Sequence, residues 1–276
     1  MALFKKVGIV GVGLIGGSLG LAIKKYKVAK EVIGIVRRKK TAQQAIRRKV
    51  VDIASRNLNL LKDADLVILA TPVCKIKEIA PSVSKVVKGE CILTDVGSTK
   101  KEIVLKLEKL FPNYIGSHPL AGSQNAGLNF ADADIFKSSL CIITPTRKTP
   151  PEVIRKITVF WNKIGAKVSL LSPSLHDKIL SYTSHLPHLV AFGLIDFIPL
   201  KYLYYSASGL KDMTRIALSL PELWRDIFIS NRKEILTSLR EFENKLYTLE
   251  KILSKKDVKS LYLFLKKAQR KRIKLL

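Results

Sequence analysis

The stretch Val7-Gly8-Ile9-Val10-Gly11-Val12-Gly13-Leu14-Ile15-Gly16-Gly17-Ser18-Leu19-Gly20 decides the fold of this chain. Its apolar beginning predicts a buried strand, and Gly11, Gly13 and Gly16 have the spacing G-x-G-x-x-G. Gly11 permits a tight turn, Gly13 lets the backbone approach a pyrophosphate, and Gly16 allows close helix packing. Unpaired N–H groups at the helix start, at Leu14 and Ile15, favour phosphate. We therefore expect a dinucleotide site here.

The sequence after the glycine turn supports this interpretation over a chance glycine turn. An apolar helix follows, and a second strand at 32–36 comes at the distance of a βαβ unit. NAD sites usually place an acidic residue at the end of that strand, to bind the ribose 2′-hydroxyl. Val36 stands there instead, followed by Arg37 and Arg38. Cations at this place favour NADP over NAD, although they would also suit a plain charged turn.

A secretory signal is the first alternative for the N-terminal segment, because Lys5 and Lys6 precede the apolar run 7–23. The glycines would weaken a signal helix, and a charged stretch rather than a small-residue cleavage site follows. The three cysteines, Cys74, Cys91 and Cys141, are odd in number and scattered, as in reduced proteins. No uninterrupted apolar run reaches the ~18 residues that a membrane span needs. We expect a cytoplasmic protein with no metal site.

The chain is strongly basic. Its 276 residues carry 49 Lys and Arg against 22 Asp and Glu, a formal net charge of +27. Such a charge can indicate a nucleic-acid partner. The basic residues are dispersed, however, and aromatic residues do not alternate with them as base stacking requires. A solvated basic surface that attracts anionic ligands explains the charge better than nucleic-acid binding.

Hydrophobic patterning divides the chain into two parts. Strands alternate with helices as far as residue 170, which predicts a Rossmann-type α/β domain with a mostly parallel sheet at 1–172. Helical patterns alone follow, which predicts an all-helical domain at 173–276. The expected strands are 7–10, 32–36, 66–72, 91–96, 114–116, 140–145 and 166–170. The expected helices are 41–50, 76–87 with a break near Pro81, 101–110, 152–164, 174–184, 187–197, 213–217, 223–253 and 258–275.

Three polar residues follow predicted strands: Thr71, Ser98 and His118. Ligands of parallel sheets bind at the carboxyl ends of the strands, where these residues are expected. His118 should lie in a loop after its strand, with either a functional or a structural role. Ser98 lacks the G-x-S-x-G elbow of a serine nucleophile. A hydroxyl that bonds a ligand or orients His118 is the better interpretation.

The helical part offers a further set of polar candidates. His185 and His188 are three apart and share a face if helical, but no acidic or thiol third ligand lies nearby for a metal. His176 has the pattern of a surface helix residue and receives no role. Arg215 follows a small-residue loop at 205–210 and suits a carboxylate ligand. An ion pair with Asp212 is its alternative.

Five motifs together resemble the prephenate/arogenate dehydrogenase family of tyrosine biosynthesis. They are the glycine turn, Asp95-Val96-Gly97-Ser98-Thr99-Lys100, Ser117-His118-Pro119-Leu120-Ala121-Gly122, Ser184-His185-Leu186-Pro187-His188 and Lys211-Asp212-Met213-Thr214-Arg215-Ile216-Ala217. The glycine turn is common to many dehydrogenases, whereas the other four in this order are specific. The resemblance implies a nucleotide-binding domain followed by a helical dimerisation domain, and therefore a homodimer.

The resemblance also implies a reaction, the oxidative decarboxylation of prephenate or arogenate with hydride transfer to NAD(P)+. His118 would accept the proton of the substrate's ring hydroxyl, for which a histidine pKa is suited. Ser98 would bind that hydroxyl or the nicotinamide side. Arg215 would bind a substrate carboxylate, and His185 and His188 would line the pocket. Trp224 matches a family position near the site, which core packing explains equally well.

The second-strand acid of NAD-using members is missing, which agrees with an NADP preference. The motifs do not distinguish prephenate from arogenate. Two alternatives remain open. A two-domain 3-hydroxy-acid dehydrogenase would use a lysine on a helix of the second domain, and no isolated lysine is so placed. A basic polyanion-binding protein with a degenerate nucleotide fold would bind nucleic acid with a steep salt dependence.

Overall fold

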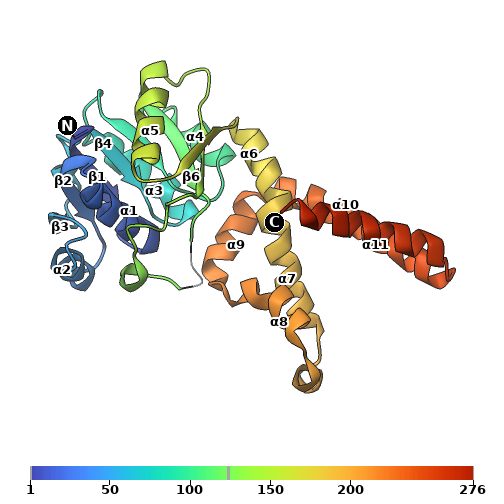
Figure 1. The fold of residues 1–276 in the computed structure, drawn as a ribbon. Coiled ribbons are helices and arrows are strands. Elements are labelled where there is room, and N and C mark those ends of the chain that lie inside the picture. Colours follow the sequence, from blue (N-terminus) through green and yellow to red (C-terminus); the bar gives the residue numbers. More distant parts are fainter. Residues whose placement is uncertain (1, 123–124, 276) are drawn as a thin grey trace. The chain divides into compact units, whose positions relative to one another are not determined.

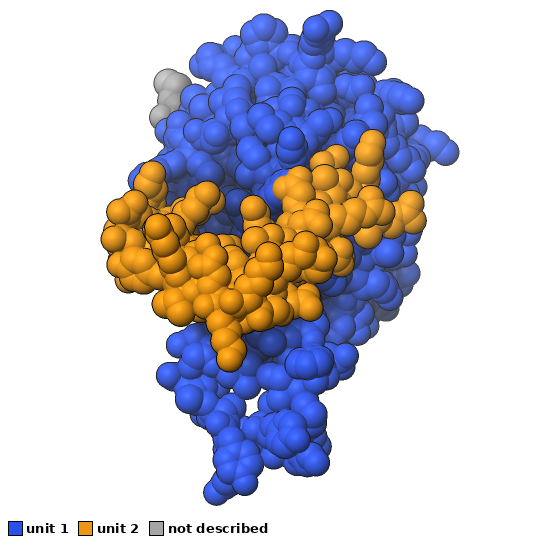
Figure 2. Space-filling model, turned by 90° about the vertical axis from the view of Figure 1, so that its right-hand side faces the viewer, with its two compact units in different colours: residues 1–231 blue, residues 232–276 orange. Residues whose placement is uncertain are grey.

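The computed structural model describes residues 2–122 and 125–275. The chain forms two compact units, Met1–Asn231 and Arg232–Leu276, which Figure 2 colours separately. The first unit holds the sheet and every site residue named above. The second consists of the helices α10 (Arg232–Ser254) and α11 (Val258–Ile273). The division between a nucleotide-binding and a helical domain at 172/173 stays a prediction.

An eight-stranded sheet forms the centre of the first unit, in the order β3-β2-β1-β4-β5-β6-β7-β8. Neighbouring strands are parallel except β6 and β7, which confirms the predicted Rossmann-type, mostly parallel sheet. The strands are β1 (Phe4–Val10), β2 (Ala29–Ile35), β3 (Ile53–Ser55), β4 (Leu66–Leu69), β5 (Ile92–Asp95), β6 (Tyr114–Pro119), β7 (Leu140–Thr144) and β8 (Lys167–Leu170).

Helices cover both faces of the sheet (Figure 1). These helices are α1 (Leu14–Lys25), α2 (Lys39–Arg47), α3 (Val73–Ser84), α4 (Lys101–Leu107) and α5 (Pro151–Lys163). Alternate residues of a strand point to opposite faces, so Val7 and Ile9 join the core under α1 and α5, whereas Val10 joins the core under α3 and α4. All four residues of β4 are buried, which explains why its sequence is continuously apolar.

The glycine turn has the predicted backbone. Gly11 has φ +96°, a left-handed conformation that a side chain disfavours. A Cβ on Gly16 would lie 1.9 Å from the carbonyl oxygen of Gly11, so this helix position requires glycine. A Cβ on Gly13 would meet no described atom within 4 Å. The turn is therefore closely packed at Gly16 and open at Gly13, the residue before α1.

Strand β6 differs from its prediction. His118 does not lie in a loop, because β6 continues beyond residue 116 to Pro119. The extension pairs with the antiparallel strand β7, with His118 opposite Ile142. The sequence pattern could not show this partner. Pro81 was also expected to break a helix, whereas α3 continues through it and ends three residues later.

The helical segments of the first unit follow the sheet. They are α6 (Pro173–Leu180), the π-helical turn η3 (Ser181–His185), α7 (Leu186–Phe197), η4 (Leu200–Tyr205), α8 (Ser208–Thr214), η5 (Arg215–Leu218) and α9 (Pro221–Ser230). The expected loop at 205–210 is thus partly helical. The expected helix 223–253 divides at Asn231 into α9 and α10, because Asn231 leaves the helical conformation. None of the helices in the described ranges could span a membrane.

We predict that Gly16→Ala destabilises the first unit and that Gly13→Ala does not. The Cβ at position 16 must displace the backbone at Gly11, at a cost of roughly 1–3 kcal/mol or more in unfolding free energy. The Cβ at position 13 enters open space. Urea unfolding of both variants measures the difference. Equal stability of the two variants would contradict the packing described for Gly16.

Candidate active site

Three predicted residues lie at the same edge of the sheet. Strands β4, β5 and β6 are parallel neighbours, and Thr71 and Ser98 follow the first two of them. His118 lies near the carboxyl end of β6 and is only 9% exposed. The glycine turn after β1 lies at this edge too, because β1 pairs with β4 in parallel. The sequence-based expectation that these residues gather there is confirmed.

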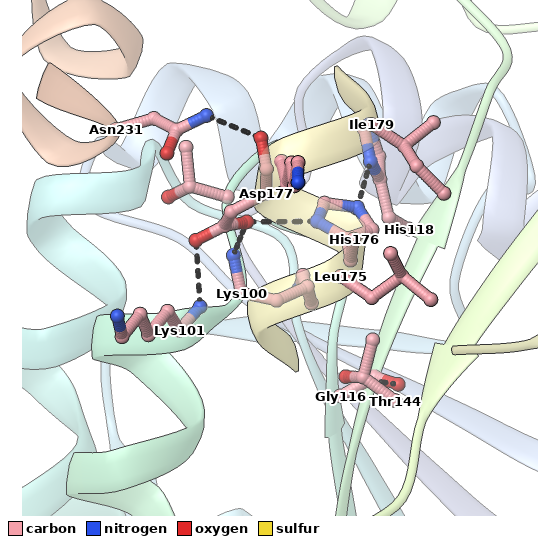
Figure 3. A network of polar contacts seen from close by, with 12 residues as sticks. Lys100, Lys101, Gly116, His118, Thr144, Leu175, His176, Asp177, Ile179 and Asn231 are labelled. Carbon is pink, nitrogen blue, oxygen red and sulfur yellow. Dashed lines mark hydrogen bonds and ion pairs between the residues drawn. The ribbon is translucent and has the colours of Figure 1, made fainter. Parts of the chain in front are cut away.

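The ring of His118 is hydrogen-bonded to His176, a residue for which sequence analysis predicted no role. Nδ1 of His118 lies 2.8 Å from Nε2 of His176, and Nδ1 of His176 lies 2.8 Å from Oδ1 of Asp177. Figure 3 shows the His176 ring between His118 and Asp177. We call these three residues the His118–His176–Asp177 network. Ser98 is half-buried and has no side-chain hydrogen bond within the described part of the chain.

The expectation of a surface position for His176 is wrong, because its side chain is completely buried. The inward side of α6 carries His176, Asp177 and Leu180, while the apolar Leu175 and Ile179 are exposed. The helix thus buries two polar residues and exposes two large apolar ones, contrary to the pattern that sequence analysis assumes. The only available signal was an adjacent His and Asp in a chain with four histidines.

The carboxylate of Asp177 is fixed by the start of α4. Oδ1 accepts the backbone N–H of Lys100 at 2.7 Å, and Oδ2 accepts that of Lys101 at 2.9 Å. A helix start offers unpaired N–H groups and a favourable dipole to an anion. Burial alone would raise the pKa of Asp177, but His176 and these N–H groups lower it below the ordinary value. Asp177 is therefore a carboxylate.

The side chain of Lys100 connects the ends of β5 and β6 near His118. It is fully buried, pairs with the carboxylate of Asp95, and donates to the carbonyl oxygen of Ser117 at 2.8 Å. Asp95 also accepts the hydroxyl of Tyr114 at 2.6 Å and the N–H of Gly97 at 2.8 Å. These bonds join the ends of β5 and β6, and so fix the backbone next to His118.

The surroundings of His118 keep its ring neutral. Burial is the main cause that lowers its pKa well below 6.5, and His176, Lys100 and His185 lower it further. Burial also lowers the pKa of His176, against the opposing effect of Asp177. Because Nδ1 of His118 is bonded to His176, Nε2 is the ring nitrogen left for a ligand. A neutral imidazole with one free nitrogen is suited to general base catalysis.

His185 presents a buried nitrogen without a partner. The amide Nδ2 of Asn231 donates to the carbonyl of Asp177 at 2.8 Å and lies 2.9 Å from Nδ1 of His185. An amide nitrogen only donates, so Nδ1 accepts and the ring proton is on Nε2. Nε2 is buried and bonds to none of the described residues. Burial lowers the pKa of His185 to about 4, so the ring is a neutral donor that awaits an acceptor.

His188 lies beside His185 against Trp224. Its ring stacks on the indole with centroids 3.5 Å apart, and His185 meets the same indole edge-on at 6.2 Å. Nδ1 of His188 donates to the carbonyl oxygen of Ser184 at 2.9 Å. Burial lowers the pKa of His188 as well. Trp224 is itself buried, so it holds both histidines in place.

Arg215 lies on η5 and is exposed, outside the His118–His176–Asp177 network. Within the described ranges it forms no ion pair, so the alternative of a pair with Asp212 is not seen. Thr71 has a buried hydroxyl without a hydrogen-bond partner among the described residues. Among the residues that the structure describes, no group of three or more His, Cys, Asp or Glu side chains could hold a metal ion.

The residues expected around the nucleotide have a matching arrangement. Val36 is buried just after the end of β2, and Arg37 and Arg38 are exposed immediately after it. The first-turn N–H groups of α1, at Leu14 and Ile15, follow the open position Gly13. Thr71, whose buried hydroxyl has no hydrogen-bond partner among the described residues, follows the neighbouring strand β4. These features fit a dinucleotide, with its pyrophosphate at the start of α1.

Comparisons with known proteins assign the family. Residues 19–170 match the model of the prephenate dehydrogenase nucleotide-binding domain, and residues 172–267 match that of the prephenate dehydrogenase dimerization domain. The chain is 33% identical to the cyclohexadienyl dehydrogenase of Zymomonas mobilis, over 100% of this chain and 97% of that protein.

Two solved structures are similar along the whole chain. One is a prephenate dehydrogenase from A. aeolicus, in complex with hydroxyphenyl propionate and NAD+, with a TM-score of 0.94 and 30% identity, covering 99% of this chain and 98% of that one. The other is an arogenate dehydrogenase from Synechocystis, with a TM-score of 0.88 and 29% identity, covering 98% and 100%. The chain therefore belongs to the prephenate dehydrogenase family.

Proposed function

We propose that this protein catalyses the NAD(P)+-dependent oxidative decarboxylation of prephenate or arogenate, a step of tyrosine biosynthesis. The observation that carries the proposal is the position of His118, at the sheet edge that holds the glycine turn, with Nδ1 bonded and Nε2 left for a ligand. Membership of the prephenate dehydrogenase family supports the same reaction and disfavours the 3-hydroxy-acid dehydrogenase and polyanion-binding alternatives.

The nucleotide would bind along the glycine turn. Gly11 and Gly16 permit the tight turn, and Gly13, Leu14 and Ile15 offer an open backbone surface to the pyrophosphate. NAD(P)+, when bound, supplies the acceptor for a hydride from the substrate ring. Thr71 would donate its unpaired hydroxyl to the nucleotide at the end of β4.

His118 would act as the general base through Nε2. It removes the proton from the hydroxyl on the substrate ring, while a hydride leaves the carbon that bears this hydroxyl. The new carbonyl is conjugated with the carbon that bears the ring carboxylate, so the bond to that carboxylate breaks and CO2 departs. The electron pair of the broken bond moves through the ring to the carbonyl oxygen, so the ring becomes aromatic and the oxygen takes back the proton from Nε2 of His118. The gain of aromaticity makes the step irreversible. Ser98 would bind the same hydroxyl or the nicotinamide side.

The remaining candidates would bind the anionic groups of the substrate. The buried Nε2–H of His185 lacks an acceptor in the protein, and a substrate oxygen would satisfy it. His188, fixed on Trp224, would line the same pocket. The guanidinium of Arg215 is exposed and unpaired within the described ranges, and would bind a carboxylate in a bidentate manner.

Three finer expectations belong to this proposal. The exposed Arg37 and Arg38, with no acid at Val36, favour NADP over NAD. The matched dimerization domain supports a homodimer, as do large apolar side chains on the helical part that are at least 81% exposed: Phe197, Leu200, Tyr204 and Tyr205. The free cysteines Cys74, Cys91 and Cys141 suit the reducing cytoplasm.

Steady-state kinetics with both substrates and both nucleotides tests the function. The purified protein should form NADPH and CO2 with prephenate or arogenate. An absence of turnover in all four combinations would refute the activity.

His118→Asn should lower kcat by roughly 10²–10⁴-fold, because the base is lost, with unchanged nucleotide binding. Unchanged turnover of the variant would remove His118 from the mechanism.

Arg37→Ser should raise the KM for NADP+ by about tenfold or more, because a charge-assisted bond to the 2′-phosphate is lost. The KM for NAD+ should stay the same, since NAD+ has no such phosphate. Lys39→Ser is a matched control on the first turn of α2, and it should change neither value. If Arg37→Ser affects both nucleotides equally, the assignment to the 2′-phosphate is wrong.

The pH dependence of kcat/KM reports the base in the free enzyme. Only neutral His118 accepts a proton, so activity should fall as the pH drops through the pKa of His118. Burial, His176 and Lys100 lower that pKa, so the acidic limb should lie below pH 6.5. A profile measured from pH 4.5 to 9 locates the limb. An acidic limb above pH 6.5 would contradict the buried, neutral state of the ring.

A further inference from the structure

The bond between His118 and His176 has a direction that the rest of the network determines. Both ring nitrogens that form it could donate or accept, depending on the tautomers. The far end of the network is fixed, however, because Asp177 accepts backbone N–H groups on both of its oxygens. Asp177 is a carboxylate, and a carboxylate has only acceptors. Nδ1 of His176 must therefore carry the proton that lies between these two residues.

The tautomer of His118 follows from that of His176. A neutral imidazole carries one N–H, so a proton on Nδ1 of His176 leaves Nε2 as an acceptor. Nε2 of His176 then accepts a proton donated by Nδ1 of His118. The remaining nitrogen of His118, Nε2, has a lone pair and no proton. A general base needs this lone pair.

The reverse direction would need a charge that the structure opposes. If Nε2 of His176 donated to His118, its Nδ1 would face Asp177 without a proton unless His176 carried two protons. Burial of His176 lowers its pKa, and the ammonium of Lys100 lowers it further, so the doubly protonated ring is disfavoured. Protonated Asp177 would be the other solution, and the N–H groups of Lys100 and Lys101 oppose it. Only one direction satisfies all the groups.

We propose that His176 and Asp177 are positioning residues, which hold His118 as the tautomer with a bare Nε2 and fix the plane of its ring. This inference deepens the proposed function and rests on His118 as its base. Nε2 of His118 holds the proton removed from the substrate hydroxyl until the ring oxygen takes it back on aromatisation, while Nδ1–H remains hydrogen-bonded to His176. No proton has to reach Asp177. The carboxylate fixes orientation and stabilises the imidazolium that forms.

Two substitutions of His176 separate its two bonds. Glutamine places a polar atom near the position of Nε2, so His176→Gln keeps an acceptor for His118. Asparagine places its polar atoms near the position of Nδ1, so His176→Asn keeps the bond to Asp177 and loses His118. We expect His176→Asn to lower kcat by roughly 10²-fold or more. His176→Gln should retain kcat within about tenfold, and neither should change KM by more than about threefold.

The two variants control each other, because both replace a buried ring by a smaller amide on the same helix. Similar thermal unfolding and nucleotide affinity of both would show that folding is intact. A loss of kcat confined to His176→Asn supports the positioning role. Equal kcat in the two variants, or changes confined to KM, would overturn it.

The tautomer itself is measurable without substrate, by NMR of protein labelled with ¹⁵N in its four histidines. The chemical shifts and couplings of the ring nitrogens show which one carries the proton. We expect His118 with the proton on Nδ1 and a bare Nε2 at pH 7.5, with His118→Asn identifying its signals. A proton on Nε2 of His118 refutes the inference even if the enzyme is active. The bare Nε2 supports it whatever substrate the protein uses.

Discussion

The carboxylate of Asp177 is the interaction on which the site depends. It accepts two backbone N–H groups at the start of α4 and the ring N–H of His176, and so joins α6 to the sheet domain. The side chain of Lys100 forms a buried pair with Asp95, which joins the ends of β5 and β6. A buried ion pair is a poor source of stability, because desolvation opposes its attraction. Its effect here is geometric and electrostatic, since it places a cation near His118 and favours the neutral ring.

The sequence was sufficient for the parts that depend on local conformation. Gly11 and Gly16 are required by backbone geometry alone, so their spacing predicted the turn. The strand β4 is buried on both faces, so its unbroken apolar run predicted a central parallel strand. The positions of Thr71, Ser98 and His118 after such runs predicted their common edge. These inferences needed no knowledge of which segments meet across the molecule.

The sequence was insufficient where distant segments decide the structure. The partner of His118 is 58 residues away, on a helix whose inward side is polar and whose exposed side carries Leu175 and Ile179. Helical periodicity therefore pointed away from His176. The antiparallel strand β7 lengthens β6, and no local signal in β6 shows this pairing. Asn231 ends α9 while its side chain bonds Asp177 and His185, a role that a helix pattern does not reveal.

The central claim is that Nε2 of His118 meets the substrate hydroxyl while Nδ1 stays bonded to His176. A crystal structure of this protein with NADP+ and a hydroxyphenyl analogue of the product tests it most directly. The hydroxyl of the analogue should lie about 3 Å from Nε2 of His118, within hydrogen-bond reach. The His176 contact should be unchanged. A hydroxyl bound by other groups, with His118 turned away from the nicotinamide, would contradict the claim.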